Sequence, residues 1–330
     1  MRAADWLTER ADAQQSGWQK HETILTPASV KGLQLLWKYR LTTRGDTILG
    51  APTILGRVIT HRGIKELVFT ADSDTLLAMD ADLGTVFWER HLEGPRNCDA
   101  PIAAPVITPA PPPTGGVPYD DEGADPTQGN RPLYALSRDG KVHTISPITG
   151  QDIASPLAFL PAGLALRGVN FFENTLYAFT GGACDSAPGK TWAIDVKNRQ
   201  KPAALSPVVA FSKKASASWN DPEGTRWIYV AADTGISAFR GGDVQTPIWK
   251  SELLNTPGSP VIAGGVVYTL ARRGTHIVLY ALDAATGQEL YSSGEAVTAG
   301  ADSGLAVANG HVCFGASNEI LYCFGLPFEP

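Results

Sequence analysis

The chain has 330 residues, of which 43% are hydrophobic and 18% are charged, and its formal net charge is −6 at pH 7. This composition excludes an intrinsically disordered chain, and the negative charge argues against nucleic acid as the main partner, because phosphate contacts need clustered Lys and Arg. No apolar run approaches the roughly 20 residues that a membrane-spanning helix needs.

Residues 1–32 are predicted to be an N-terminal extension, and the first strand follows at Leu33–Leu41. This strand is similar to two later stretches, Val86–Leu92 and Ile248–Leu253. Both later stretches are predicted to be the outermost, fourth strand of a four-stranded unit. The chain therefore starts with a fourth strand that has no preceding first strand.

A hairpin pattern recurs along the chain after this strand. Leu77–Trp88 and Leu279–Tyr291 each alternate apolar and polar residues, turn at Asp-x-x-x-Gly, and alternate again. The small residue of each first hairpin strand marks six copies: Ala78, Thr144, Ala193, Ala238, Ala281 and Cys323. Their successive steps are 66, 49, 45, 43 and 42 residues. Such a period, with four short strands per step, predicts a β-propeller.

We predict an all-β fold: a six-bladed β-propeller with four antiparallel strands per blade, spanning residues 33–330 as a single domain. The last copy, Ile320–Leu326, stops after its third strand. The N-terminal strand Leu33–Leu41 is therefore expected to complete the last blade and to close the ring.

The Ala-x-Asp-x-x-Thr-Gly-x-x-x-Trp pattern resembles the repeat of the PQQ-like, or quinoprotein alcohol dehydrogenase-like, β-propellers of secreted bacterial type. Ala78–Trp88 and Ala281–Tyr291 are nearly complete copies, and the resemblance covers roughly residues 20–326. It implies an extracytoplasmic protein, periplasmic or secreted. Because residues 1–15 lack a signal peptide pattern, the start is interpreted as that of a mature form fused to an initiator Met.

An insertion at residues 109–132 lengthens the second blade and contains Pro111–Pro113 and Asp120–Glu122. It is predicted to be a surface loop. Its acidic run is either solvated or able to hold Ca²⁺ through carboxylate oxygens.

Binding and catalysis in propellers usually occur where the loops from fourth to first strands and from second to third strands gather at the channel mouth. These loops mix acidic and basic residues, which suits a polar ligand or a protein loop. The candidate binding residues are Arg167, Asp302, Lys214, Asp99, Asp185, His276 and Arg272. No hydrolase, zinc-protease or phosphate-loop motif is present, so each candidate could equally be a solvated turn residue.

The four cysteines fall into two candidate disulfide pairs. Cys313 and Cys323 flank a short hairpin and would lie opposite each other. Cys98 and Cys184 lie on long loops of one predicted face. For each pair free thiols remain an alternative, and an even count in an extracytoplasmic chain favours disulfides.

Two functional classes remain open, together with a general catalytic alternative. The first is a non-catalytic propeller that binds a protein or saccharide partner, as the resemblance to a bacterial outer-membrane assembly propeller implies. The second is a PQQ-dependent dehydrogenase, in which the quinone stacks on a Trp and Ca²⁺ or a lanthanide is held by carboxylate and amide oxygens. Those enzymes are larger, have eight blades and carry adjacent cysteines, which this chain lacks. The general alternative is a hydrolase or lyase with its site in the channel mouth. We rank partner binding first and predict no cofactor.

Overall fold

The computed structural model describes residues 4–41, 49–72, 74–92, 94, 105–109, 130–164, 166–182, 185–198, 203–205, 215–241 and 245–327. Within these ranges the chain is all-β apart from one short 3-10 turn, η1 (Val30–Gly32). The prediction of an all-β fold built from antiparallel four-stranded sheets is thus confirmed. No helix in the described ranges is long and apolar enough to cross a membrane.

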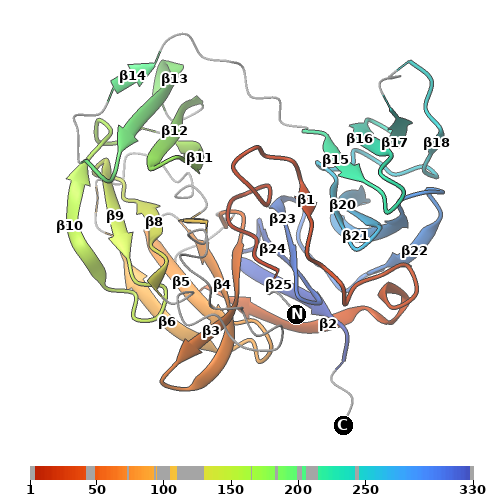
Figure 1. Cartoon of the computed structure of the whole chain (residues 1–330), viewed down its shortest axis with the longest axis horizontal. Coiled ribbons are helices and arrows are strands. Elements are labelled where there is room, and N and C mark those ends of the chain that lie inside the picture. The colour runs from red at the N-terminus through yellow and green to blue at the C-terminus, as the bar shows by residue number, and fades with distance from the viewer. Residues whose placement is uncertain are drawn as a thin grey trace. The chain divides into compact units, whose positions relative to one another are not determined.

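The chain divides into two compact units. The first contains residues 7–9 and 47–210, and the second contains residues 4–6, 10–46 and 211–330. The described strands of each unit form three sheets, and most of these strands are labelled in Figure 1.

The first unit consists of three antiparallel sheets of four strands each. The first of them contains β3 (Thr53–Thr60), β4 (Gly63–Ala71), β5 (Thr75–Asp80) and β6 (Val86–His91). The second contains β7 (Val106–Ile107), β8 (Leu133–Leu136), β9 (Lys141–Ile145) and β10 (Asp152–Ala158). The third contains β11 (Leu166–Phe172), β12 (Thr175–Gly182), β13 (Asp185–Asp195) and β14 (Ala203–Leu205).

The second unit contains three sheets, two of which include a strand from the N-terminal region. One holds β15 (Ala217–Asn220), β16 (Arg226–Ala232), β17 (Gly235–Arg240) and β18 (Trp249–Lys250). The next holds β1 (Trp18–Gln19), β19 (Val261–Ala263), β20 (Val266–Arg273), β21 (His276–Asp283) and β22 (Glu289–Ser292). The third holds β2 (Gln34–Arg40), β23 (Asp302–Ala308), β24 (His311–Ala316) and β25 (Ile320–Gly325).

The N-terminal strand β2 pairs antiparallel with β25, the last strand of the chain, with Trp37 opposite Cys323. The predicted completion of the last sheet by this strand is therefore confirmed. Residues 10–33 before it also belong to the second unit, where β1 adds in parallel to the edge strand β19. Arg10, only 7% exposed, donates hydrogen bonds to the carbonyl oxygens of Ser216 at 2.7 Å and Pro260 at 3.2 Å. These contacts anchor the extension within its unit.

The turn residues of the repeat have a direct structural role. The carboxylate of Asp283 accepts hydrogen bonds from the backbone N–H groups of Ala285 and Thr286, and Asp80 makes the same contacts with Asp82 and Leu83. An Asx turn of this kind fixes the tight connection between two strands. Gly287 follows at φ +77°, in the left-handed region that glycine adopts without strain. The spacing of Asp and Gly therefore encodes the turn.

Hydrophobic side chains between neighbouring sheets form the core of each unit. In the first unit, the indole N–H of Trp88 on β6 donates to the carbonyl oxygen of Pro147 in the next sheet at 2.8 Å. Its ring packs on the backbone of Gly150, where an added Cβ would lie 2.8 Å from Trp88 Cδ2. The Trp of one repeat is thus held by the turn of the next, which joins two sheets that share few backbone contacts.

Cys313 on β24 and Cys323 on β25 occupy directly opposed positions and form a disulfide, with Cα atoms 4.1 Å apart. The prediction of this bridge is confirmed. Cys98 and Cys184 lie outside the described residues, as does most of the insertion at 109–132.

Several predicted loops are instead strand. The link Gly181–Lys190 was expected to be a long loop, but β12 continues to Gly182 and β13 begins at Asp185. Arg272 and His276 were expected on a linking loop, but they lie in β20 and β21, and the turn is confined to Gly274 and Thr275. Asp302 and Arg167 likewise lie within strands, at the start of β23 and in β11. The paired strands are longer than the alternation of apolar residues in the sequence indicates. Polar residues can occupy the ends of strands where these face solvent.

Candidate functional site

A pocket of about 170 Å³ lies in the second unit between two neighbouring sheets. The loop before β19 contributes Thr256 and Gly258, and the end of the β20–β21 hairpin contributes Arg272 and Ile277. Asp302, together with the two residues before it, forms the side that belongs to the next sheet. These segments are a second-to-third-strand hairpin and two loops that lead into first strands.

Asp302 is the acidic group of the pocket. The loop before Asp302 is held against the β24–β25 turn, because the N–H of Ser317 donates a hydrogen bond to the carbonyl oxygen of Ala301 at 3.0 Å. The Asp302 carboxylate accepts a hydrogen bond from the N–H of Gly304 at 2.9 Å. Burial raises its pKa to about 6, while the Gly304 hydrogen bond and the charge of Arg272 act in the opposite direction. Asp302 is therefore a carboxylate at neutral pH, and its burial outweighs the groups that stabilise its charge.

Arg272 is the basic group of the pocket, and its side chain is exposed. Its backbone is fixed on both sides, because it pairs with Ile277 on β21 and its N–H donates to the carbonyl oxygen of Asn255 at 2.9 Å. None of the ion pairs found among the described residues joins Arg272 to Asp302. Two opposite charges thus line one pocket without neutralising each other directly.

Thr256 has an unusual backbone conformation, with φ at +44°. This region is costly for a β-branched residue, so the surrounding structure must hold it there. The N–H of Thr256 donates to the carbonyl oxygen of Asp233 at 2.8 Å. The strained position therefore places a hydroxyl-bearing residue in the pocket wall.

His276, also a predicted site residue, does not line this pocket. It pairs with Arg273, and successive residues of a strand point to opposite faces, so it faces away from the Arg272–Ile277 pair. Its Nε2 atom is enclosed and has no hydrogen-bond partner among the described residues.

The remaining predicted site residues are not brought to the pocket by the structure described. Arg167 lies in β11 and Asp185 begins β13, both in the first unit, and their side chains lie outside the description. Lys214 and Asp99 lie outside the described residues. Sequence reasoning missed Thr256, whose strain depends on a hydrogen bond across 23 residues of chain.

The fold was compared with known proteins. No family model matches the sequence, and no curated protein matches it. Among solved structures, quinohemoprotein alcohol dehydrogenase from Comamonas testosteroni is similar, with a TM-score of 0.54 at 13% identity over 100% of this chain and 82% of that one. The chain shares the β-propeller fold of this protein. The resemblance of its repeats to PQQ-like β-propellers is thus confirmed at the level of the fold.

Two further solved structures were found at lower similarity. BamB from Moraxella catarrhalis has a TM-score of 0.33 at 16% identity, covering 90% of this chain and 99% of that one. Quinohemoprotein alcohol dehydrogenase ADHIIG from Pseudomonas putida HK5 has a TM-score of 0.40 at 16% identity, and the match covers 88% of this chain and 48% of that one.

The residues of the pocket do not fit the quinone and metal that this propeller fold can hold. The described residues that line the pocket include no Trp on which a quinone could stack, and Asp302 is the single carboxylate among them. No group of three or more His, Cys, Asp or Glu side chains suited to a metal occurs in the described part of the chain. Arg272 adds a positive charge that opposes a cation here.

A second polar cluster in the first unit has the residue types of a hydrolase triad. His143 Nε2 lies 3.1 Å from Ser137 Oγ, and its Nδ1 lies 3.3 Å from Asp152 Oδ1. Arg90 also pairs with Asp152 and donates to the carbonyl oxygen of Gly150. This cluster could not be predicted from the sequence, because Ser137, His143 and Asp152 come from one sheet and Arg90 comes from β6 of another sheet.

The geometry of this cluster is structural rather than nucleophilic. Ser137 is only 2% exposed, and its hydroxyl donates to Asp139 instead of to His143. Burial lowers the pKa of His143, and the Arg90 charge lowers it further against the effect of Asp152. We therefore assign the cluster to the packing of β6, β9 and β10.

Proposed function

We propose that this protein is a non-catalytic, extracytoplasmic six-bladed β-propeller that binds a protein or saccharide partner through the face that carries the Arg272–Asp302 pocket. The observation that carries the proposal is the presence of both charges in one pocket, where neither forms an ion pair with the other. Charged groups that lack partners on a protein surface are free to engage those of another molecule.

The fold and the cysteines support the other parts of the proposal. The six described sheets, one of them completed by β2, are what a six-bladed ring requires. The Cys313–Cys323 bridge favours an oxidising compartment, because disulfides are rare in the reducing cytosol.

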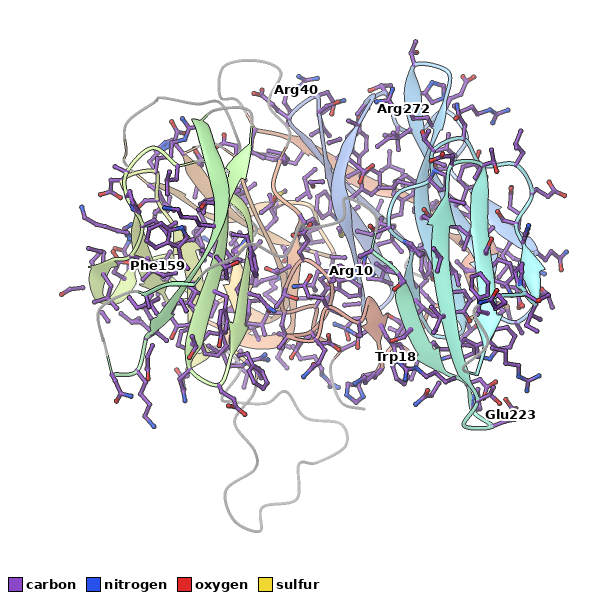
Figure 2. The ribbon with its side chains drawn as sticks, turned by 90° about the horizontal axis from the view of Figure 1, so that it is seen from above. Arg10, Trp18, Arg40, Phe159, Glu223 and Arg272 are labelled. Atoms are coloured by element: carbon purple, nitrogen blue, oxygen red, sulfur yellow. A yellow bond between two sulfur atoms is a disulfide. The ribbon has the colours of Figure 1, made fainter. Side chains whose placement is uncertain are left out.

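The test measures partner binding by variants with altered charge on this face. Full-length protein is immobilised and presented to a glycan array and to extracytoplasmic proteins, with bound material quantified by mass spectrometry. The variants are Arg272→Glu and Asp302→Lys, and the matched control is Glu223→Lys. Figure 2 shows Glu223 and Arg272 at opposite ends of the sheets of the second unit, and Glu223 is exposed.

We expect a ligand that wild type and the control retain and that both pocket variants lose by at least about tenfold. Equal retention by all four proteins would contradict the proposed face. A quinone absorbance band that appears on adding PQQ and Ca²⁺, and that tracks a bound cofactor, would contradict the non-catalytic assignment.

A further inference from the structure

The Arg272–Asp302 pocket has a charge arrangement that limits which ligands it can accept. A simple anion could pair with Arg272 but would be repelled by the Asp302 carboxylate. A simple cation could pair with Asp302 but would be repelled by Arg272. A ligand that carries both charges a few bonds apart satisfies both groups at once. Charge-assisted hydrogen bonds of this kind, above all those of a guanidinium with a carboxylate, are stronger than neutral ones.

We propose that this pocket binds the zwitterionic end of an α-amino acid, with the ligand's ammonium group on Asp302 and its carboxylate on Arg272. The inference rests on the proposed binding function and names the ligand chemistry of the same site.

The size and walls of the pocket agree with this ligand class. A volume of about 170 Å³ corresponds to about six water molecules at roughly 30 Å³ each, and lies below the roughly 300–1,000 Å³ of pockets for drug-sized ligands. One small amino acid fits such a space. Leu270 and Ile277 supply apolar wall for a short side chain.

Thr256 provides an independent observation at the same place. Its φ of +44° is a strained conformation for a β-branched residue, and such strain is concentrated at binding sites that a rigid surrounding maintains. Thr256 lines the pocket, and a threonine hydroxyl can donate to the ligand's carboxylate or accept from its ammonium group. The site thus offers one positive, one negative and one neutral polar group.

The first experiment uses three probes of nearly equal size on the full-length protein at pH 7.5, where Asp302 is ionised. Alanine, in both its L and D forms, carries both charges, propionate lacks the ammonium group, and ethylamine lacks the carboxylate. Binding is measured by calorimetry. We expect saturable binding of at least one alanine enantiomer and at least about tenfold weaker binding of propionate and ethylamine. Failure of both enantiomers to bind folded protein, or equal binding of the single-charge probes, would overturn the proposal.

The second experiment uses Arg272→Gln and Asp302→Asn, with Glu223→Gln as the control and thermal unfolding as the check of folding. Each pocket variant should weaken alanine binding by at least about tenfold, and the control should not change it. Unchanged affinity in both folded pocket variants would overturn the assignment of the site.

Nε-acetyl-L-lysine distinguishes the source of the zwitterion. Binding comparable to that of alanine indicates that the site accepts the end of a larger molecule, and its exclusion indicates a free small amino acid. Both results support the ligand class. If no zwitterion binds while partner capture still depends on Arg272, this inference fails and the proposed function stands. If alanine binds and no macromolecule is captured, this inference stands and the proposed function fails.

Discussion

The indole of Trp249 packs on the backbone of Gly287 in the neighbouring sheet, and its N–H donates to the carbonyl oxygen of Ala284 at 3.0 Å. Trp88 and Gly150 repeat this relationship in the first unit. The Trp and the Gly of the repeat are therefore two halves of one contact between successive blades. A side chain at the glycine would displace the indole.

The first prediction tests this contact through Gly287→Ala. An added Cβ would lie 2.7 Å from Trp249 Cδ2 at a backbone φ of +77°, so both overlap and strain oppose it. We expect the free energy of unfolding to fall by about 2–4 kcal/mol, measured by urea denaturation. Gly294→Ala is the matched control, because Gly294 has φ of +56° but no atom within 4 Å of an added Cβ. It should cost about 1 kcal/mol, and equal costs at both sites would show that the Trp contact is unimportant.

The second prediction concerns the Cys313–Cys323 disulfide, which closes a loop with a sequence separation of 10 residues. Loss of the bridge in Cys313→Ala/Cys323→Ala should lower the free energy of unfolding by about 2–3 kcal/mol, since the unfolded chain gains freedom. Urea denaturation with and without a reducing agent measures the effect. The double variant retains only Cys98 and Cys184, so any effect of the reducing agent on its stability comes from these two cysteines. A double variant as stable as oxidised wild type would contradict the prediction.

The third prediction follows from the pKa of Asp302, which burial raises from 3.8 to about 6. Between these values the folded state holds more protons than the unfolded state, so stability decreases as pH rises through this window. Asp302→Asn should therefore stabilise the protein at pH 7.5 and have little effect near pH 4. We expect about 1–2 kcal/mol, because partial solvent contact reduces the full effect of a shift of this size. Chemical denaturation at both pH values, with Glu223→Gln as the control, measures it. A destabilised variant at pH 7.5 would contradict the sign.

The fourth prediction concerns His143, whose pKa burial lowers below the ordinary value of 6.5. Just below pH 6.5 the unfolded state binds more protons than the folded state, so the free energy of unfolding falls with decreasing pH. His143→Gln should reduce the difference in the free energy of unfolding between pH 7.5 and pH 5.5, measured by urea denaturation. The control variant is His61→Gln, which removes an exposed imidazole outside the Ser137–His143–Asp152 cluster. A His143→Gln variant with the full wild-type pH dependence would show that this group does not titrate on unfolding.

The strands and turns of this propeller could be predicted because their determinants are local. Alternation placed β5 and β21, and the Asp and Gly of each turn define hairpins through backbone contacts within a few residues. The position of Cys313 opposite Cys323 follows from the same hairpin register. The pairing of β2 with β25 was predictable because the repeat left one unit without its fourth strand.

Strand ends and the polar clusters could not be predicted in this way. Arg272 and Asp302 are 30 positions apart, and the sequence placed them only on the same type of loop. Their presence in one pocket depends on how two sheets pack, as does the strain at Thr256. The Ser137–His143–Asp152 contacts likewise depend on the register of β9 with β10.

The sequence by itself determined the repeat, the hairpins, the position of Cys313 opposite Cys323 and the completion of the last sheet, because each depends on periodicity or on neighbours along the chain. Only the tertiary structure decided which charged residues share a pocket, that His276 faces away from it, and that residues before β2 join the second unit through β1 and Arg10. These features depend on packing between segments far apart in sequence, which local propensity does not specify.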